Sequence, residues 1–227
     1  MPITHQAIIF DMDGVLVDSE PLHLAATNAV LAEEGASLSS LENRIYLGTN
    51  ERAYWRALVE RFGLRRPAEE CMERKRAETH RRLREALPVA PGVRDFARAA
   101  RARGLALGVA SGSDRDLVEF VLSGVGIDDL VGAIAAGDEV GRPKPDPEIF
   151  LLAAERLGID PEVCLVFEDS ANGARAALAA GMGCVRVVTE TTRGLDFPEV
   201  HGSIDSFVDQ RVDDWIVRPI RGEEYGR

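Results

Sequence analysis

The sequence predicts an α/β protein with a doubly wound parallel sheet, and three observations support this fold class. Short, continuously apolar runs, typical of buried strands, alternate with segments whose apolar residues recur at helical spacing. Strands that lack polar alternation are typical of a parallel sheet covered by helices on both faces. Residues 19–87 carry helical patterns only. We therefore expect an α/β core domain formed by 1–18 and 88–227, with 19–87 inserted as an all-helical domain.

The first strand is predicted over residues 6–10, where the apolar run QAIIF ends at Asp11. The insert follows at once. Gly35 and Gly63 end its first two helices, and Pro67 is a favourable first-turn residue for the third. These helices are predicted over 20–34, 51–62 and 67–87.

From residue 88 onward, strands and helices alternate. The apolar runs LALGVA, VCLVF and CVRVV are the clearest strands, and glycines follow most of the helices. The strands are predicted over 105–110, 131–135, 163–167 and 184–188. The helices are predicted over 92–103, 114–122, 146–157 and 172–180.

Composition excludes several classes of function. The chain has 27 basic and 38 acidic residues, a net charge of −11, which argues against nucleic acid as a partner. It has no run of 18 apolar residues and no signal-peptide pattern, so we expect no membrane partner and a cytoplasmic location. Its cysteines, Cys71, Cys164 and Cys184, form no CxxC pair, which argues against zinc binding and a disulfide framework. We expect a monomer or a weak homodimer.

Polar residues cluster where the predicted strands end. Asp11-Met12-Asp13-Gly14 follows the first strand and Ser111-Gly112-Ser113 the second, Lys144 comes after the third, and Glu168-Asp169 follows the fourth. A single Asp after a strand is often only a turn or cap residue. Ligands of open α/β sheets bind at the carboxyl ends of the strands, so four polar strand ends together predict one site.

This set of residues points to phosphoryl chemistry. Several converging carboxylates need a cation, and hard oxygen ligands suit Mg²⁺. One carboxylate can attack phosphorus, and a second can act as general acid and then as general base. Lys144 would stabilise the charge of the transferred group, and the Ser111 hydroxyl would bind its oxygens.

Four ordered segments resemble the motifs of one family. DMDGVLVDSEPLH, VASGSD, GRPKPDPEIF and VFEDSANG resemble motifs I to IV of the haloacid dehalogenase superfamily, in the subfamily with a helical cap after motif I. The resemblance extends to about residue 190 and implies a Rossmann-like core with a cap at 19–87. It implies Asp11 as nucleophile and metal ligand, and Asp13 as general acid/base with its backbone carbonyl on the metal. It implies Ser111 and Lys144 as the motif II and motif III residues and Asp169 as a metal ligand. Glu168 is implied as a ligand directly or through water.

The presence of Asp13 bears on the reaction class. Dehalogenases and phosphonate-cleaving members of this superfamily lack the second Asp, so the resemblance implies a phosphate ester as substrate.

Lys144 is one of only two lysines among the 27 basic residues, the other being Lys75. A lysine in a chain that otherwise uses Arg suggests a chemical requirement at this position.

The cap residues are expected to select the substrate. By resemblance to β-phosphoglucomutase, a member of the same subfamily, the candidate substrate-binding residues are His23, Gly48, Thr49, Glu51, Arg52 and Arg76, with Gly112 and Ser113 from the core. His23 fits equally well as a partly buried helix residue. Glu51 stands where the mutase has an Arg for its second phosphate, which weighs against a bisphosphate ligand. Arg76 is the best candidate of the basic run 74–76, because three successive helix residues cannot face one site.

We therefore predict a Mg²⁺-dependent phosphatase that hydrolyses a small phosphorylated metabolite, such as a sugar phosphate or a phosphoglycolate-like acid, through an aspartyl phosphate. A β-phosphoglucomutase-type mutase is the alternative, since nothing in the core motifs separates the two. A non-catalytic module that binds a phosphometabolite is the third reading, and it would require loss of the nucleophile or metal site.

Overall fold

The chain divides into two compact units, which are described separately. One comprises Met1–Asp18 and Val89–Arg227, and the other comprises Ser19–Pro88. The computed structural model describes residues 3–46, 51–209, 212 and 219–220. The helical unit therefore spans the predicted insert with one further residue at its end.

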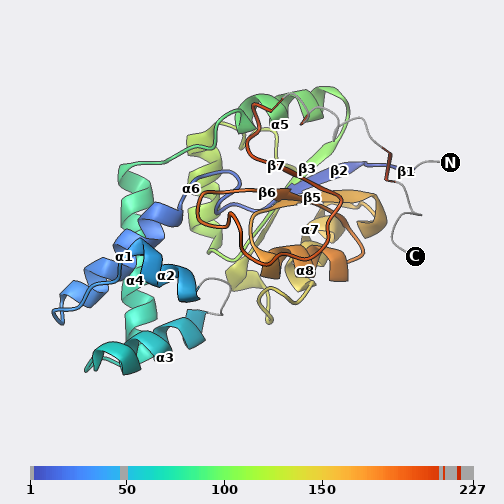
Figure 1. Cartoon of the computed structure of the whole chain (residues 1–227). Helices are drawn as coiled ribbons and strands as arrows, with labels where there is room; N and C mark the ends of the chain where they lie inside the picture. Colours follow the sequence, from blue (N-terminus) through green and yellow to red (C-terminus); the bar gives the residue numbers. More distant parts are fainter. Residues whose placement is uncertain (1–2, 47–50, 210–211, 213–218, 221–227) are drawn as a thin grey trace. The chain divides into compact units, whose positions relative to one another are not determined.

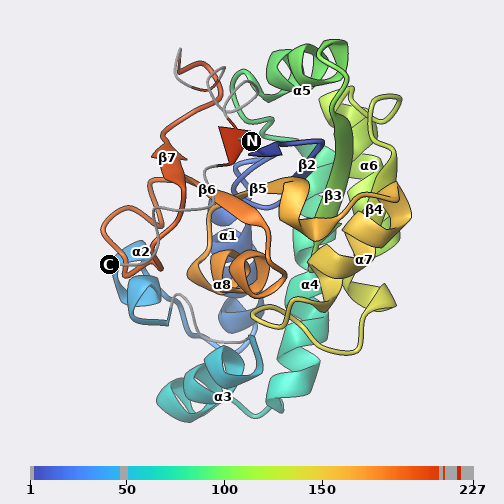
Figure 2. The same cartoon turned by 90° about the vertical axis from the view of Figure 1, so that its right-hand side faces the viewer.

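The first unit is built on a six-stranded parallel sheet with strand order β4-β3-β2-β5-β6-β7 (Figures 1 and 2). The strands are β2 (Ala7–Phe10), β3 (Ala106–Ser111), β4 (Ala133–Ala136), β5 (Cys164–Glu168), β6 (Gly183–Val187) and β7 (Gly202–Ile204). Within the register, Ala7 pairs with both Ala106 and Cys164, so β2 occupies the middle of the sheet. A separate antiparallel pair joins β1 (Ile3–Thr4) to β8 (Pro219–Ile220).

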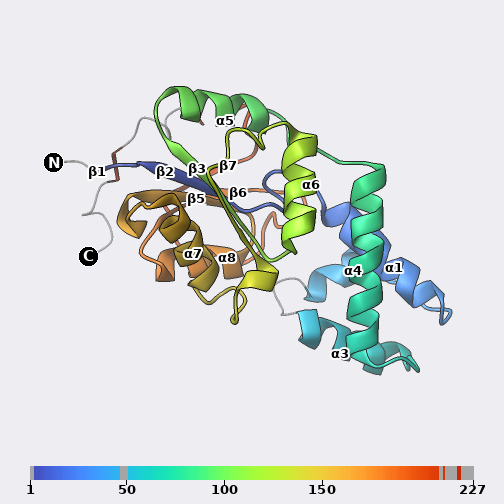
Figure 3. The ribbon, with the colours of Figure 1, turned by 180° about the vertical axis from the view of Figure 1, so that it is seen from behind.

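Helices cover both faces of this sheet. The helices are α5 (Val93–Ala102), α6 (Arg115–Val125), α7 (Glu148–Leu157) and α8 (Ala171–Ala179), with 3-10 turns η2 (Gly137–Glu139) and η3 (Pro161–Val163). Figures 2 and 3 show α7 and α8 on one face and α5 on the other, and α6 lies on the α5 side. This is the doubly wound α/β arrangement that the alternating pattern predicts, so the predicted fold class is confirmed.

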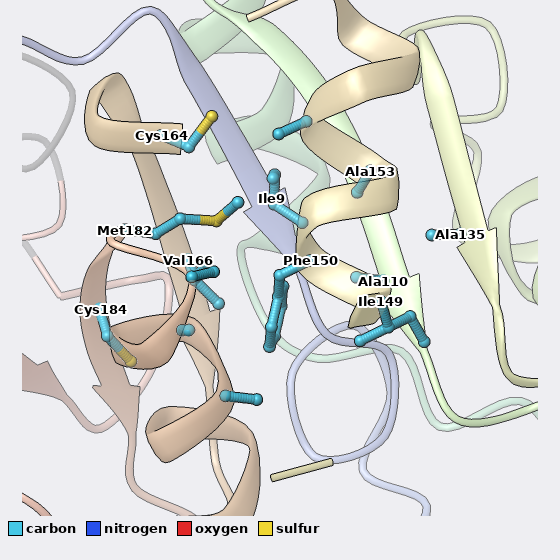
Figure 4. Packing of buried hydrophobic residues seen from close by; sticks show 14 of the residues in the cluster. Ile9, Ala110, Ala135, Ile149, Phe150, Ala153, Cys164, Val166, Met182 and Cys184 are labelled. Carbon is cyan, nitrogen blue, oxygen red and sulfur yellow. The ribbon is translucent and has the colours of Figure 1, made fainter. Parts of the chain in front are cut away.

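Strand periodicity divides the core into two layers. Ala7, Ile9, Cys164 and Val166 belong to the cluster that packs against α7 and α8, where Figure 4 shows Phe150 beside Ile9 and Val166. The alternate residues face α5. There Phe10 stacks on Phe167 with ring centroids 5.8 Å apart, and Phe96 packs edge-on against both rings. Because successive strand side chains point to opposite faces, each strand contributes to both layers.

The second unit contains only helices among its described residues. They are α1 (Glu20–Ala32), α2 (Ser40–Asn43), η1 (Arg44–Tyr46), α3 (Glu51–Phe62) and α4 (Ala68–Glu85). Helix α4 packs along α1 and α3, and their apolar faces enclose a core that includes Leu31, Trp55, Leu58 and Cys71. Across the described part of the chain, no helix combines the length and apolar character needed to cross a membrane.

The predicted element boundaries agree with the structure to within a few residues. The prediction lacks four strands and helices, α2, β7, β1 and β8, and the 3-10 turns η1, η2 and η3. All are four residues or shorter, which is too short for a periodic pattern to develop.

Candidate active site

Two acidic side chains reach the site because they continue the alternation of neighbouring central strands. Asp11 follows Ile9 on the same face of β2, and its amide still donates to the Phe167 carbonyl at 3.0 Å. Glu168 follows Val166 in the same way on β5. Parallel pairing of β2 with β5 therefore brings both carboxyl groups to one edge of the sheet, above the layer formed by α7 and α8.

Lys144 bridges these two carboxylates. Its Nζ lies 2.7 Å from Asp11 Oδ1 and 2.7 Å from Glu168 Oε1, and it donates to the Ala110 carbonyl at 3.2 Å. The Phe150 ring lies beneath the ammonium, with Nζ 4.7 Å from the ring centroid. The three donors of the ammonium thus have three oxygen partners, and the cation rests on an aromatic face.

Asp169 completes a buried acidic group. One carboxylate oxygen each from Asp11, Glu168 and Asp169 lie within 4.8 Å of one another. Gly14 packs against this group so closely that a Cβ there would lie 2.2 Å from Asp169 Oδ2. Its φ of +76° also favours glycine. Gly14 is therefore required both by the turn after Asp13 and by the space that Asp169 occupies.

The loop after β3 brings hydroxyl groups to the same edge. Ser111 is fully buried at the end of β3, and its Oγ accepts a hydrogen bond from the Ser113 amide at 3.1 Å. The Ser113 hydroxyl lies 3.4 Å from Asp13 Oδ2. Gly112, between the two serines, is exposed, and a Cβ on it would meet nothing within 4 Å. The structure thus brings the predicted motif II residues next to the predicted motif I residues.

Burial and charge act together on Asp11 and Lys144. The pKa of Asp11 is raised to about 7, chiefly by burial; Lys144 acts against this rise, and the charges of Glu168 and Asp13 add to it. Burial alone would lower the pKa of Lys144. The charges of Asp11 and Glu168 outweigh that effect, so the pKa of Lys144 lies above its ordinary value. The ammonium is therefore charged throughout the physiological range.

The donor set fits a hard divalent cation. Three buried carboxylates face a single ammonium, so the group carries an excess of negative charge in a poorly solvated position. A cation beside Asp11 would favour its ionised form. Carboxylate oxygens are the ligands that Mg²⁺ prefers in proteins.

The candidate residues of the helical unit lie on three of its helices. His23 lies in the first turn of α1 and is half-buried, and Arg52 forms an exposed ion pair with Glu69 at 3.4 Å. In the basic run of α4, it is Lys75 that pairs with Glu51, with Nζ 3.2 Å from Oε1. Arg76 is exposed. Gly48 and Thr49 lie outside the described residues.

Several residues of the site were not expected from the sequence. Phe150 and the Ala110 carbonyl contact Lys144, and Ser170 contacts Glu168 through both its amide and its hydroxyl. Of these residues, only Ser170 had a recognisable sequence pattern, since a serine just before a helix is a typical N-cap. The sequence identifies Phe150 and Ala110 only as core residues, because their contacts with Lys144 depend on tertiary packing.

Comparison with known proteins gives a consistent result. The family model described as haloacid dehalogenase-like hydrolase matches residues 5–181. The chain is 34% identical over 177 residues to the "Phosphorylated carbohydrates phosphatase" of Thermotoga maritima, covering 78% of this chain and 82% of that protein. It is 35% identical over 189 residues to "Hexitol phosphatase B" of Escherichia coli K12, covering 80% and 82%.

Solved structures of related proteins have a similar fold. CbbY from Rhodobacter sphaeroides, crystallised in complex with phosphate, superposes with a TM-score of 0.78 at 30% identity, covering 91% of this chain and 96% of CbbY. The β-phosphoglucomutase of Clostridium difficile gives a TM-score of 0.72 at 24% identity, covering 95% and 100%, a likeness that concerns the fold alone.

Proposed function

Since the chain belongs to the haloacid dehalogenase-like hydrolases, we propose that it is a Mg²⁺-dependent phosphatase that hydrolyses a small phosphorylated sugar or polyol. The observation that carries this proposal is the Lys144 ammonium held 2.7 Å from Asp11, beside the three buried carboxylates. This arrangement combines a nucleophile, a fixed positive charge and a set of cation ligands at one edge of the sheet.

In the proposed reaction, a carboxylate oxygen of Asp11 attacks the phosphorus atom of the ester. The new O–P bond gives an aspartyl phosphate while the bond from phosphorus to the leaving oxygen breaks. Asp13 donates a proton to that leaving oxygen, so the product departs as an alcohol. Asp13 then takes a proton from a water molecule, which attacks the aspartyl phosphate, releases inorganic phosphate and restores Asp11.

The surrounding residues stabilise the charge that develops during transfer. Lys144 already contacts Asp11, and its ammonium would interact with the oxygens of the transferred group. The buried Ser111 hydroxyl and the backbone amides of its loop offer further hydrogen bonds to the same oxygens. Asp11, Asp169 and the backbone carbonyl of Asp13 would hold Mg²⁺, with Glu168 as a further candidate ligand. When bound, this ion would neutralise phosphate charge and keep Asp11 ionised.

The choice of substrate class rests on relatives and on the helical unit. Relatives with names that specify phosphorylated carbohydrates and hexitol phosphates cover about four-fifths of the chain. Within the helical unit, Lys75 pairs with Glu51, the residue that stands where the mutase carries an arginine for its second phosphate, which supports a monophosphate as substrate.

A phosphate-release screen over a panel of phosphorylated metabolites tests the proposal. We expect Mg²⁺-dependent hydrolysis of a generic aryl phosphate and faster hydrolysis of particular sugar or polyol monophosphates. Asp11→Asn should abolish both activities. Correctly folded protein that releases no phosphate from any ester in the presence of Mg²⁺ would refute the proposal.

A phosphoglucomutase-type activity is the second candidate, because the core motifs do not separate the two activities and a solved Thermotoga maritima structure described as "putative beta-phosphoglucomutase" is 30% identical, with a TM-score of 0.72 over 92% of this chain. Incubation with β-glucose 1-phosphate and its bisphosphate primer separates the two activities. A phosphatase releases inorganic phosphate, whereas a mutase forms glucose 6-phosphate without comparable phosphate release. The latter result would favour the mutase.

A further inference from the structure

Both oxygens of the Glu168 side chain are engaged by specific partners. Oε1 lies 2.7 Å from Lys144 Nζ, while Oε2 accepts hydrogen bonds from the Ser170 amide at 2.7 Å and the Ser170 hydroxyl at 3.0 Å. The side chain is 1% exposed. Lys144 on one side and Ser170 on the other therefore fix the plane of this carboxylate.

The Ser170 hydroxyl also begins helix α8. Its Oγ accepts a hydrogen bond from the Gly173 amide at 3.0 Å, which makes Ser170 the N-cap of the helix. A hydroxyl has one donor hydrogen and two acceptor lone pairs, so it can cap the helix and donate to Glu168 at the same time. One side chain thus ties the position of α8 to the orientation of Glu168.

Gly173 provides the space that this arrangement needs. A Cβ at position 173 would lie 1.6 Å from Glu168 Oε1, the same oxygen that contacts Lys144. Gly173 lies inside α8 without a positive φ, so the backbone itself does not call for glycine. The requirement is the close approach of the Glu168 carboxylate to the first turn of the helix.

We propose that Ser170 is a positioning residue, which orients Glu168 and through it holds the Lys144 ammonium against Asp11, with Gly173 keeping the space for the Glu168 carboxylate. The order of contacts is Ser170 to Glu168, Glu168 to Lys144, and Lys144 to Asp11. The kinetic part of this proposal rests on the proposed phosphatase function. The packing part rests on the structure alone.

The kinetic test compares Ser170→Ala with Ser170→Thr. We expect Ser170→Ala to lower kcat about 10-fold, the lower end of the effect of losing a supporting hydrogen bond in a metal-assisted site. KM for the ester should stay unchanged, because the lost contact acts through Glu168 on Lys144 and not on the bound ester. Ser170→Thr keeps the hydroxyl and should restore most of the turnover.

A matched control separates positioning from helix capping. Asp160 caps the short turn η3, where its side chain accepts a hydrogen bond from the Glu162 amide at 3.0 Å. It has no hydrogen bond or ion pair with Ser170, Glu168, Lys144 or Asp11. Loss of a cap should lower Tm by about 2–4 °C in either Ser170→Ala or Asp160→Ala. Only Ser170→Ala should also lower kcat at a temperature where both variants are folded.

A stability cycle tests the packing without any substrate. Gly→Ala inside a helix normally stabilises a protein, but we expect Gly173→Ala to lower Tm because the new methyl group displaces Glu168. In a Glu168→Ala background the same change should be neutral or stabilising. In a Glu168→Gln background it should remain costly, because Gln keeps the bulk of the side chain.

Three results would overturn the proposal. They are unchanged kcat in Ser170→Ala, a change confined to the half-saturating Mg²⁺ concentration, and an equal cost of Gly173→Ala in all three backgrounds. Failure of the phosphatase function would appear differently, as a wild-type protein that hydrolyses no ester while the stability cycle still gives the expected pattern.

Discussion

The most informative single change is Asp11→Asn, studied as a change in stability rather than in activity. Burial raises the pKa of Asp11 from 3.8 to about 7. At about 1.4 kcal/mol for each pKa unit, the ionised carboxylate costs the metal-free folded protein up to about 4 kcal/mol. Asn has the size of the protonated acid and carries no charge. We therefore expect Asp11→Asn to be more stable than the wild type above neutral pH when no divalent ion is present.

The sign of the pH dependence follows from the two pKa values. Between pH 3.8 and about 7 the folded state retains a proton on Asp11 that the unfolded state releases. The contribution of this group to stability is therefore fully present below pH 3.8 and is lost as the pH rises through about 7. The difference in unfolding free energy between Asp11→Asn and wild type should grow over this window and then level off.

Urea denaturation in the presence of a chelator, at a series of pH values from 4 to 8, measures this difference. Asp129→Asn is the matched control, because Asp129 is exposed in the turn after α6 and should show no such trend. Added Mg²⁺ should close or reverse the gap, since an ion that binds only the folded wild type stabilises it. A gap that does not vary with pH, or an Asp11→Asn variant less stable than wild type at pH 8 with chelator, would refute the reasoning.

Three further predictions concern the site and its support. Lys144→Arg should lower kcat by about 10²-fold, because a broad guanidinium does not fit between Asp11 and Glu168 above the Phe150 ring. Near-normal turnover in a steady-state assay would contradict this prediction. Glu139→Gln should lower the unfolding free energy by about 1–2 kcal/mol at pH 7 in denaturant titrations. A hydrogen bond from Arg156 is the largest cause that lowers the pKa of Glu139 to about 2, so its contribution is present above pH 4.5 and should disappear as the pH falls through about 2. Removal of divalent ions with a chelator should abolish phosphate release and Mg²⁺ should restore it; full activity in chelator would exclude the metal-assisted reaction.

Much of the core could be predicted because its signals are local. The apolar runs that form β2 and β5 are continuous, and glycines follow several of the helices, so strand and helix positions could be assigned from periodicity. Asp11 and Glu168 could be placed at one sheet edge, since both directly follow predicted strands. The three-residue strand β7 could not be predicted, because too few residues show its alternation.

The contacts of Lys144 with Asp11 and Glu168 could not be predicted from the sequence. Lys144 lies in a loop 24 residues before Glu168 and 133 residues after Asp11, and only the folded chain brings the three together. In the helical unit, the choice between Lys75 and Arg76 depends on the rotation of α4, because adjacent helix residues point about 100° apart. The structure pairs Lys75 with Glu51 and leaves Arg76 exposed.

The central position of β2 has a consequence for how the protein is made. This strand is synthesised before its two partners, β3 and β5, which begin at Ala106 and Cys164. At about 5–20 residues per second, β2 waits roughly 8–30 s after its own synthesis before β5 exists. Residues 19–88 emerge during this wait and contain an apolar cluster of their own. We therefore expect the inserted unit to fold first during synthesis, while the segment that carries Asp11 remains without its sheet until most of the chain has been made.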